Sequence, residues 1–273
     1  MQSCKEETGV RSLRVRDITA AIEAQFPLRL AMDWDNPGLL CGRADKEVHH
    51  VIAALDATDE VIEQAVSEGA DLILTHHPMI FRPIAKINED TSVGRRVIRL
   101  IQHDISYYAM HTNFDVGKGG MADLVAERLG IGARTPLEQT GEAEDGTPIG
   151  IGFVGELSAP CTAKALAEFV KTSFAIPALD YYDGGRMIQR IAVCPGSGHG
   201  MYKYACAAGA DAFVTGDMGH HDGLDAIEDG VSLIDAGHFG LEHIYTDWAK
   251  KFLAETFPEL SCSVNLSNLR HSL

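Results

Sequence analysis

The stretch GADLILTHHPMIF, residues 69–81, places two adjacent histidines at the end of a short apolar run. Residues 71–75 predict a buried strand, because a continuous apolar run of this length suits a strand that is covered on both faces. Gly69 before the run is a favourable residue for the end of a preceding helix. Pro78 stops the run, so the stretch predicts a strand that ends in two imidazoles.

The segments around this stretch alternate between strand and helix patterns. Apolar runs at residues 51–56, 71–75 and 105–110 predict strands, and the segments between them have helical spacing, at residues 59–70 and 92–104. An order of strand, helix, strand, helix, strand is typical of a parallel sheet with crossover helices.

The same unit recurs in the second half of the chain. GADLILT (residues 69–75) matches GADAFVT (209–215). HTNFD (111–115) matches HFGLE (238–242), because both consist of a histidine, three further residues and an acid. Likeness of composition alone is the simpler alternative, but shared motifs in the same order favour an internal repeat. We therefore predict an α/β fold with two similar lobes, each a mostly parallel sheet with flanking helices.

The predicted division follows from this repeat. We place the first lobe in residues 1–130, with part of the C-terminal helix added to it, and the second lobe in residues 151–273. Residues 131–150 are rich in Gly, Pro, Thr and Glu, which predicts a connecting loop.

Composition limits the partners that we expect. The net charge of −16 over 273 residues disfavours direct binding to nucleic acid or to anionic membrane. No apolar run reaches the roughly 18 residues of a membrane span, and residues 1–17 lack the apolar core of a signal peptide. We therefore expect a cytoplasmic protein without a membrane partner.

Three clusters of histidine and carboxylate follow predicted strand ends. They are His76 with His77, His111 with Asp115, and His238 with Glu242. Functional groups gather at the carboxyl ends of strands in open α/β sheets. Neutral imidazoles and carboxylates suit Zn, Fe, Mn or Co. The clusters contain more donor groups than a single catalytic ion with an open coordination position needs. We therefore expect two divalent transition-metal ions, with His76 and His77 binding one each.

Three motifs are each consistent with two interpretations. Adjacent histidines at the end of a strand, such as His76 and His77, can cap loop backbone groups and need not bind metal. His220 and His221 are the repeat's counterpart of His76 and His77. They either orient ligands or contact substrate, or they belong to an N-cap region in which Asp222 starts a helix. PGSGHG, residues 195–200, fits a phosphate-binding loop or an ordinary tight turn equally well.

Six motifs together resemble the NIF-three-like family, whose members are often called GTP cyclohydrolase 1 type 2 homologues. In order they are DWDNPGLLCG, ILTHHPMIF, HTNFD, GSG, TGD with HHD, and DAGHFGLE. The resemblance implies two α/β lobes around a dinuclear metal centre and a homo-oligomer, often a ring-like hexamer. The sequence departs from the family pattern at Pro37, at residues 239–241 and in its C-terminal ending, and none of these departures removes a ligand.

The resemblance also implies roles for single residues. The metal ligands would be His76, His77, Asp115, His238 and Glu242, and His111 would lie beside the metals. We expect His111 or His221 to hold ligands in place or to transfer a proton.

Two functions of different classes are consistent with these features. The first is a metal-dependent hydrolase, cyclohydrolase-like or phosphohydrolase-like, which acts through a metal-activated water on a small molecule such as a nucleotide. The second is a non-enzymatic scaffold that holds metal or binds another protein. We favour the hydrolase, and an open coordination position reached by a pocket would distinguish it from the scaffold.

Overall fold

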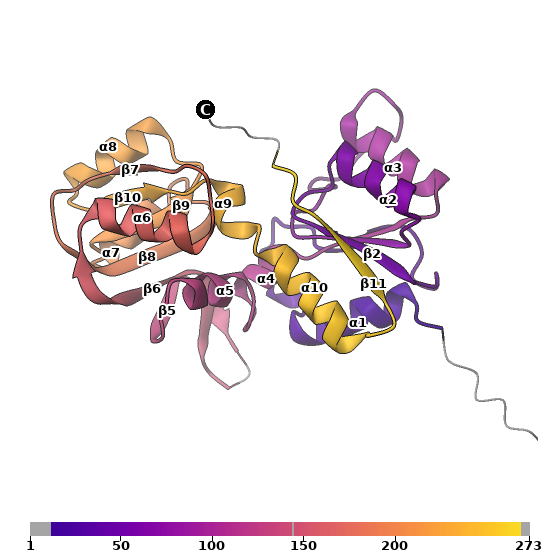
Figure 1. The fold of residues 1–273 in the computed structure, drawn as a ribbon, viewed down its shortest axis with the longest axis horizontal. Coiled ribbons are helices and arrows are strands. Elements are labelled where there is room, and N and C mark those ends of the chain that lie inside the picture. Colours follow the sequence, from indigo (N-terminus) through magenta and orange to yellow (C-terminus); the bar gives the residue numbers. More distant parts are fainter. Residues whose placement is uncertain (1–11, 144, 269–273) are drawn as a thin grey trace, which may run out of the picture.

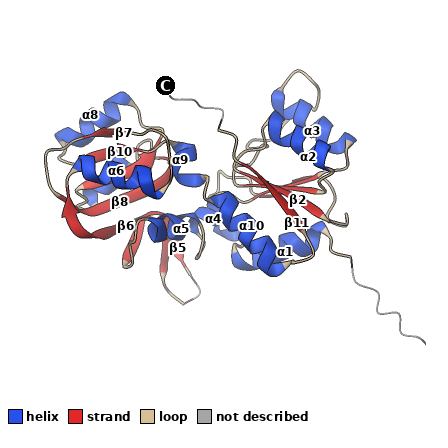
Figure 2. Ribbon diagram, in the orientation of Figure 1, coloured by secondary structure: helices blue, strands red, loops and turns tan. Residues whose placement is uncertain are grey.

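The structure is a computed structural model that describes residues 12–143 and 145–268. The predicted α/β class is confirmed, with two sheets flanked by helices (Figure 1). Figure 2 shows the strands of the two sheets on either side of a central region that contains helices α4 and α9. None of the helices in the described part of the chain is long and apolar enough to span a membrane.

The first sheet has five strands in the order β1-β4-β3-β2-β11. Strands β2, β3, β4 and β11 run parallel, and β1 pairs antiparallel with β4. The strands are β1 (Gly38–Cys41), β2 (His50–Ala54), β3 (Leu72–Thr75), β4 (Ser106–Ala109) and β11 (Ser261–Asn265). The helices around this sheet are α1 (Val15–Gln25), α2 (Asp59–Glu68), α3 (Ser92–Gln102) and α10 (Tyr245–Thr256), with the short η1 (Leu28–Leu30) after α1.

The second sheet has six strands in the order β5-β6-β8-β9-β10-β7, of which β8, β9 and β10 run parallel. The strands are β5 (Arg134–Glu142), β6 (Pro148–Cys161), β7 (Asp180–Tyr182), β8 (Ile188–Ser197), β9 (Ala212–Gly216) and β10 (Ser232–Asp235). The remaining helices are α4 (Thr112–Val116), α5 (Met121–Arg128), α6 (Ala163–Ser173), α7 (Tyr202–Ala207), α8 (His220–Glu228) and α9 (His238–Glu242).

The apolar strands are covered on both faces. In β2, Val51 and Ala53 pack in a core cluster with α1 and α10, whereas Ile52 and Ala54 pack with α2 on the other face. The first of these clusters also contains residues of the second sheet, such as Val193 of β8. The two sheets therefore share one continuous apolar core.

The internal repeat extends to individual hydrogen bonds. The Asp71 carboxylate accepts hydrogen bonds from the backbone N–H groups of His49 and His50, at 2.8 and 3.2 Å. Asp211 does the same for Gln189 and Arg190, at 2.9 and 2.8 Å. The repeated Gly-Ala-Asp thus has a physical cause: the glycine ends a helix with positive φ, and the aspartate fixes the start of the neighbouring strand.

Two expectations about the chain path need correction. Residues 131–150 were expected to form a connecting loop, but β5 and the start of β6 pair antiparallel there as a hairpin at the edge of the second sheet. The C-terminal residues were assigned to the second lobe, but β11 pairs with β2 of the first sheet. We propose the same two lobes with α10 and β11 added to the first.

Candidate metal centre

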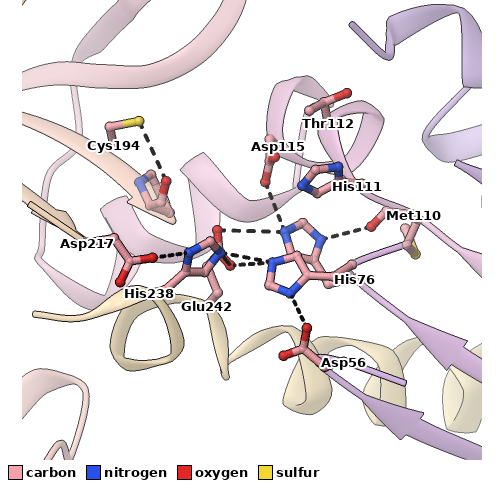
Figure 3. Close-up of polar contacts among 12 residues, drawn as sticks. Asp56, His76, Met110, His111, Thr112, Asp115, Cys194, Asp217, His238 and Glu242 are labelled. Atoms are coloured by element: carbon pink, nitrogen blue, oxygen red, sulfur yellow. Dashed lines mark hydrogen bonds and ion pairs between the residues drawn. The ribbon is translucent and has the colours of Figure 1, made fainter. Parts of the chain in front are cut away.

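Six of the predicted site residues come together between the two sheets. His76 and His77 follow β3, His111 and Asp115 lie at and within α4, and His238 and Glu242 lie on α9. Below, the histidine–carboxylate cluster means His76, His77, His111, Asp115, His238 and Glu242. His238 and Glu242 are four residues apart on one helix, so both side chains leave the same helical face. Each half of the repeat contributes donors to the same place (Figure 3).

All four histidines of the cluster are held by one ring nitrogen. In each ring Nδ1 lies 2.7–2.8 Å from an oxygen that can only accept, so Nδ1 carries the proton. The pairs are His76 with the Met110 carbonyl, His77 with Asp56, His111 with Asp35, and His238 with Asp217. Whenever one of these rings is neutral, its Nε2 atom therefore has a lone pair.

Three of these Nε2 atoms face one another or a carboxylate. Nε2 of His77 lies 3.1 Å from Nε2 of His238 and 3.0 Å from Oε2 of Glu242. Nε2 of His76 lies 3.5 Å from Oδ1 of Asp115 and 3.8 Å from Oε1 of Glu242. Lone pairs and negative oxygens this close repel unless a proton or another cation lies among them. The chemistry of the cluster therefore favours cation binding.

Two buried atoms of the cluster have no hydrogen-bond partner within the described residues: Nε2 of His76 and Oδ1 of Asp115. The His76 side chain is fully buried, so bulk water does not compensate its Nε2. Unsatisfied buried polar atoms are uncommon in native proteins and call for a bound ion or water. The two atoms lie 3.5 Å apart, so a single ion or water between them would satisfy both.

The pKa values show the same electrostatics. Burial acts to lower the pKa of His77, but hydrogen bonds with Asp56 and Glu242 overcome it and raise this pKa to about 10. Burial likewise acts to lower the pKa of His238, but hydrogen bonds with Glu242 and Asp217 overcome it and raise this pKa to about 9. Burial acts to raise the pKa of Glu242, but the adjacent histidines hold it well below its ordinary value. Protons are thus held where the lone pairs converge.

Three groups of residues within the cluster could hold a metal ion, since their ligand atoms lie within 4.8 Å of one another. The groups are His76 with His77 and His111, His77 with His238 and Glu242, and His76 with Asp115 and Glu242. His111 therefore lies closer to the other donors than we expected from the sequence.

The structure does not bring His221 into these groups. His221 is exposed in the first turn of α8, and its ring lies 5.4 Å from that of His220. Of the two interpretations of this segment, the start of a helix fits, although Gly219 and not Asp222 is the N-cap residue. The cluster also lies away from a surface hollow of about 300 Å³ between α2 and α3, where Arg96 and Arg99 are paired with acids.

Sequence reasoning missed the aspartates that hold the histidines. Asp56 ends the apolar run 51–56 and Asp217 follows β9, so a strand-end acid was the available signal for both. Asp35 lies in the DWDNPG segment, where burial acts to raise its pKa and hydrogen bonds from His111 and Thr112 lower it to about 2. Asp217 has φ of 55°, a left-handed conformation that aspartate adopts more readily than most residues.

Comparison with known proteins gives the family. A sequence model of the family described as Duf34/NIF3 (NGG1p interacting factor 3) matches residues 13–272. The chain belongs to the Duf34/NIF3 family. A Clostridium acetobutylicum protein named "GTP cyclohydrolase 1 type 2 homolog" is 38% identical over 232 residues, which cover 85% of this chain and 86% of the relative.

Solved structures share the Duf34/NIF3 fold. A hypothetical protein of Staphylococcus aureus superimposes with a TM-score of 0.86 at 28% identity, covering 96% of this chain and 100% of the other. A Bacillus cereus protein related to NIF3 gives a TM-score of 0.85 at 24% identity, covering 96% and 99%, which supports the fold alone. Membership of the Duf34/NIF3 family confirms the resemblance inferred from the six motifs.

Proposed function

We propose that this chain is a metal-dependent hydrolase that holds two divalent transition-metal ions, Zn, Fe, Mn or Co, at the histidine–carboxylate cluster. The observation that carries the proposal is the convergence of the Nε2 atoms of three histidines, His76, His77 and His238, on the carboxylates of Asp115 and Glu242. Imidazole and carboxylate donors of this kind match those metals. The substrate would be a nucleotide or a related small molecule, as the name of the Clostridium relative suggests.

Two of the three groups account for all five predicted ligands. His76 and Asp115 would hold one ion, His77 and His238 would hold the other, and Glu242 belongs to both groups. Its two oxygens already face different partners: Oε1 lies 3.8 Å from His76, and Oε2 lies 3.0 Å from His77. Glu242 is therefore suited to bridge the two ions, which supports the expectation that His76 and His77 serve one ion each.

The remaining residues would act around this centre. Two such ions, when bound, supply Lewis acidity and lower the pKa of water toward neutrality. The aspartates at Nδ1 of His77, His111 and His238 hold these rings in a fixed orientation, as partners of ligating imidazoles commonly do. His111, whose Nδ1 is held by Asp35, would hold or transfer a proton at its other nitrogen, in a side chain that is 18% exposed.

The test combines metal analysis with a substrate screen. Protein purified without chelator should contain close to two transition-metal ions per chain, and should hydrolyse at least one member of a panel of nucleotides, phosphoesters and cyclic amides, GTP included. Glu242→Ala should lose both properties, whereas Glu255→Ala, an exposed acid on α10, should keep them.

The outcomes separate the two functions. No metal, or magnesium alone, would contradict the dinuclear centre. Two ions without turnover on any substrate would instead favour a non-enzymatic, metal-holding scaffold. We also propose a cytoplasmic homo-oligomer, a hexamer by family resemblance, which light scattering after size exclusion can measure.

A further inference from the structure

Two exposed aromatic rings lie beside the cluster. Trp34 is 58% exposed and Phe81 is 39% exposed, and their ring centroids are 5.8 Å apart. Both rings contact the imidazole of His111, at 6.1 Å from Trp34 and 6.3 Å from Phe81. Single exposed aromatic residues need no explanation. Here, however, two exposed rings lie against each other and against a histidine of the cluster, so together they form an aromatic surface next to it.

The backbone that carries these rings is tied to the cluster. The carboxylate of Asp35, next to Trp34, accepts hydrogen bonds from His111 Nδ1 at 2.7 Å and from the Thr112 backbone N–H at 3.0 Å. The Asn36 side-chain amide donates to the carbonyl of Ile80, next to Phe81, at 2.5 Å. The two rings are thus held relative to His111 before any ligand arrives, which lowers the ordering cost of binding.

The cluster is closed on its opposite side. The His76 ring is fully buried and packs 5.4 Å from Tyr245 and 5.9 Å from Phe114. Glu242 is only 3% exposed. His111 is partly exposed, as are His77 and His238, so a ligand on Trp34 and Phe81 would approach the cluster from the side of these imidazoles, next to His111.

We propose that Trp34 and Phe81 bind a planar aromatic or heteroaromatic ring of the substrate by stacking. The proposal rests on the proposed hydrolase and deepens it, because it assigns the residues that would bind the ring of the substrate, with the reacting group projecting from that ring toward His111. Aromatic rings pair at centroid distances of 4.5–7 Å in offset or edge-to-face arrangements, and both side chains leave surface free for such a contact. Their position next to His111 favours a ligand that reacts there over a second copy of the chain.

Tryptophan fluorescence gives a direct measurement. The chain has two tryptophans, and Trp248 is packed against Phe26 and Phe114 at 5.3 and 4.8 Å. Titration of the metal-loaded protein with guanosine 5′-monophosphate should therefore quench Trp34, whereas ribose 5-phosphate, which lacks the ring, should not. The quenching should vanish in Trp34→Phe, while the calorimetric affinity for the nucleotide should fall less than in Trp34→Ala, because phenylalanine keeps a ring for stacking.

Calorimetry on further variants decides the assignment. Trp34→Ala and Phe81→Ala should each weaken nucleotide binding about 5- to 150-fold, the size of one lost stacking contact. Phe169→Ala, which removes a 43% exposed ring from α6, should leave it unchanged. Metal content should equal that of the wild type in all variants.

Three results would overturn the assignment of Trp34 and Phe81 as a stacking site. The first is that no planar probe binds to protein that carries its metal. The second is equal nucleotide affinity in Trp34→Ala and the wild type, and the third is dissociation of an oligomer in the alanine variants. The last would mean that a second copy covers the rings. Because metal content is measured separately, a wild type without metal would instead refute the proposed hydrolase.

Discussion

Gly196, in the last part of β8, is expected to control the position of Glu242. Its φ is +75°, and a Cβ placed on it would lie 2.5 Å from Oε1 of Glu242. Ordinary contact begins at 3.4 Å, so the carboxylate oxygen would have to move by about 0.9 Å in Gly196→Ala. A displacement of this size exceeds the roughly 0.5 Å within which functional groups must be held.

The expected effect has two separable parts. Alanine in a left-handed conformation costs about 1–2 kcal/mol, which would lower the melting temperature of the metal-free protein by roughly 2–8 °C for a chain near this size. Displacement of Glu242 should additionally weaken metal binding on the order of 10–100-fold, as loss of support for a ligand commonly does.

Gly200→Ala is the matched control, because Gly200 has φ of +78° and no atom within 4 Å of an added Cβ. Both variants should therefore lose similar thermal stability without metal, and only Gly196→Ala should lose metal affinity, measured by competition with a chelating dye. Wild-type metal affinity in Gly196→Ala, or an equal loss in Gly200→Ala, would refute the reasoning.

Three further predictions concern the cluster. Glu242→Ala should lose metal more completely than His111→Ala, because of these two side chains only the carboxylate can bridge two cations. The measurements are metal content and melting temperature with added zinc or manganese. Retention of two ions by Glu242→Ala with loss in His111→Ala would show that the ligands are wrongly assigned. Asp217→Ala should lower metal affinity about 10–100-fold, while Asp217→Asn, which keeps an acceptor for His238 and tolerates positive φ, should lose less; equal losses would contradict an orienting role. The pKa values of His77 and His238 are raised to about 10 and 9. Protonation of these rings therefore stabilises the metal-free protein fully below pH about 6.5, and this stability is lost as pH rises toward the raised values. The increase in melting temperature on adding metal should consequently grow from pH 6 to pH 9, and a constant increase would exclude competition between metal and protons.

Much of the candidate centre could be predicted because its donors follow local patterns. His76 and His77 end an apolar strand, and the paired His-x-x-x-acid motifs occupy equivalent points of a repeat. Strands β3 and β4 end at one edge of the first sheet, which brings His76, His77 and the His111 motif together. The His238 motif follows β10 of the second sheet, and the packing of the two sheets brings it to the same place. The parallel order of β2, β3 and β4 could be predicted for the same reason, since their apolar runs alternate with helical segments.

The supporting residues could not be predicted, because their partners are distant in sequence. His111 and Asp35 are 76 residues apart, and His77 and Asp56 are 21 apart. The role of Gly196 depends on Glu242, a residue of another element, so its segment resembled any tight turn. Such contacts follow from the packing of elements, which no local pattern contains.

The two wrong assignments also have physical causes. Of the nine residues of β5, only Leu137 is buried, so this edge strand lacks the alternation that identifies a strand. None of the five residues of β11 is fully buried, and its parallel partner β2 lies about 200 residues earlier. A short polar edge strand resembles a tail until the sheet that it joins is known.

The late position of β11 has a consequence during biosynthesis. Strand β2 is the edge of the first sheet until β11 pairs with it, and exposed edges can pair with other chains. At about 5–20 residues per second, the ribosome needs roughly 8–30 s to add the residues between Ala109 and Asn265. The nascent chain therefore carries an unprotected apolar strand through most of its synthesis, and we expect it to engage ribosome-associated chaperones until β11 emerges.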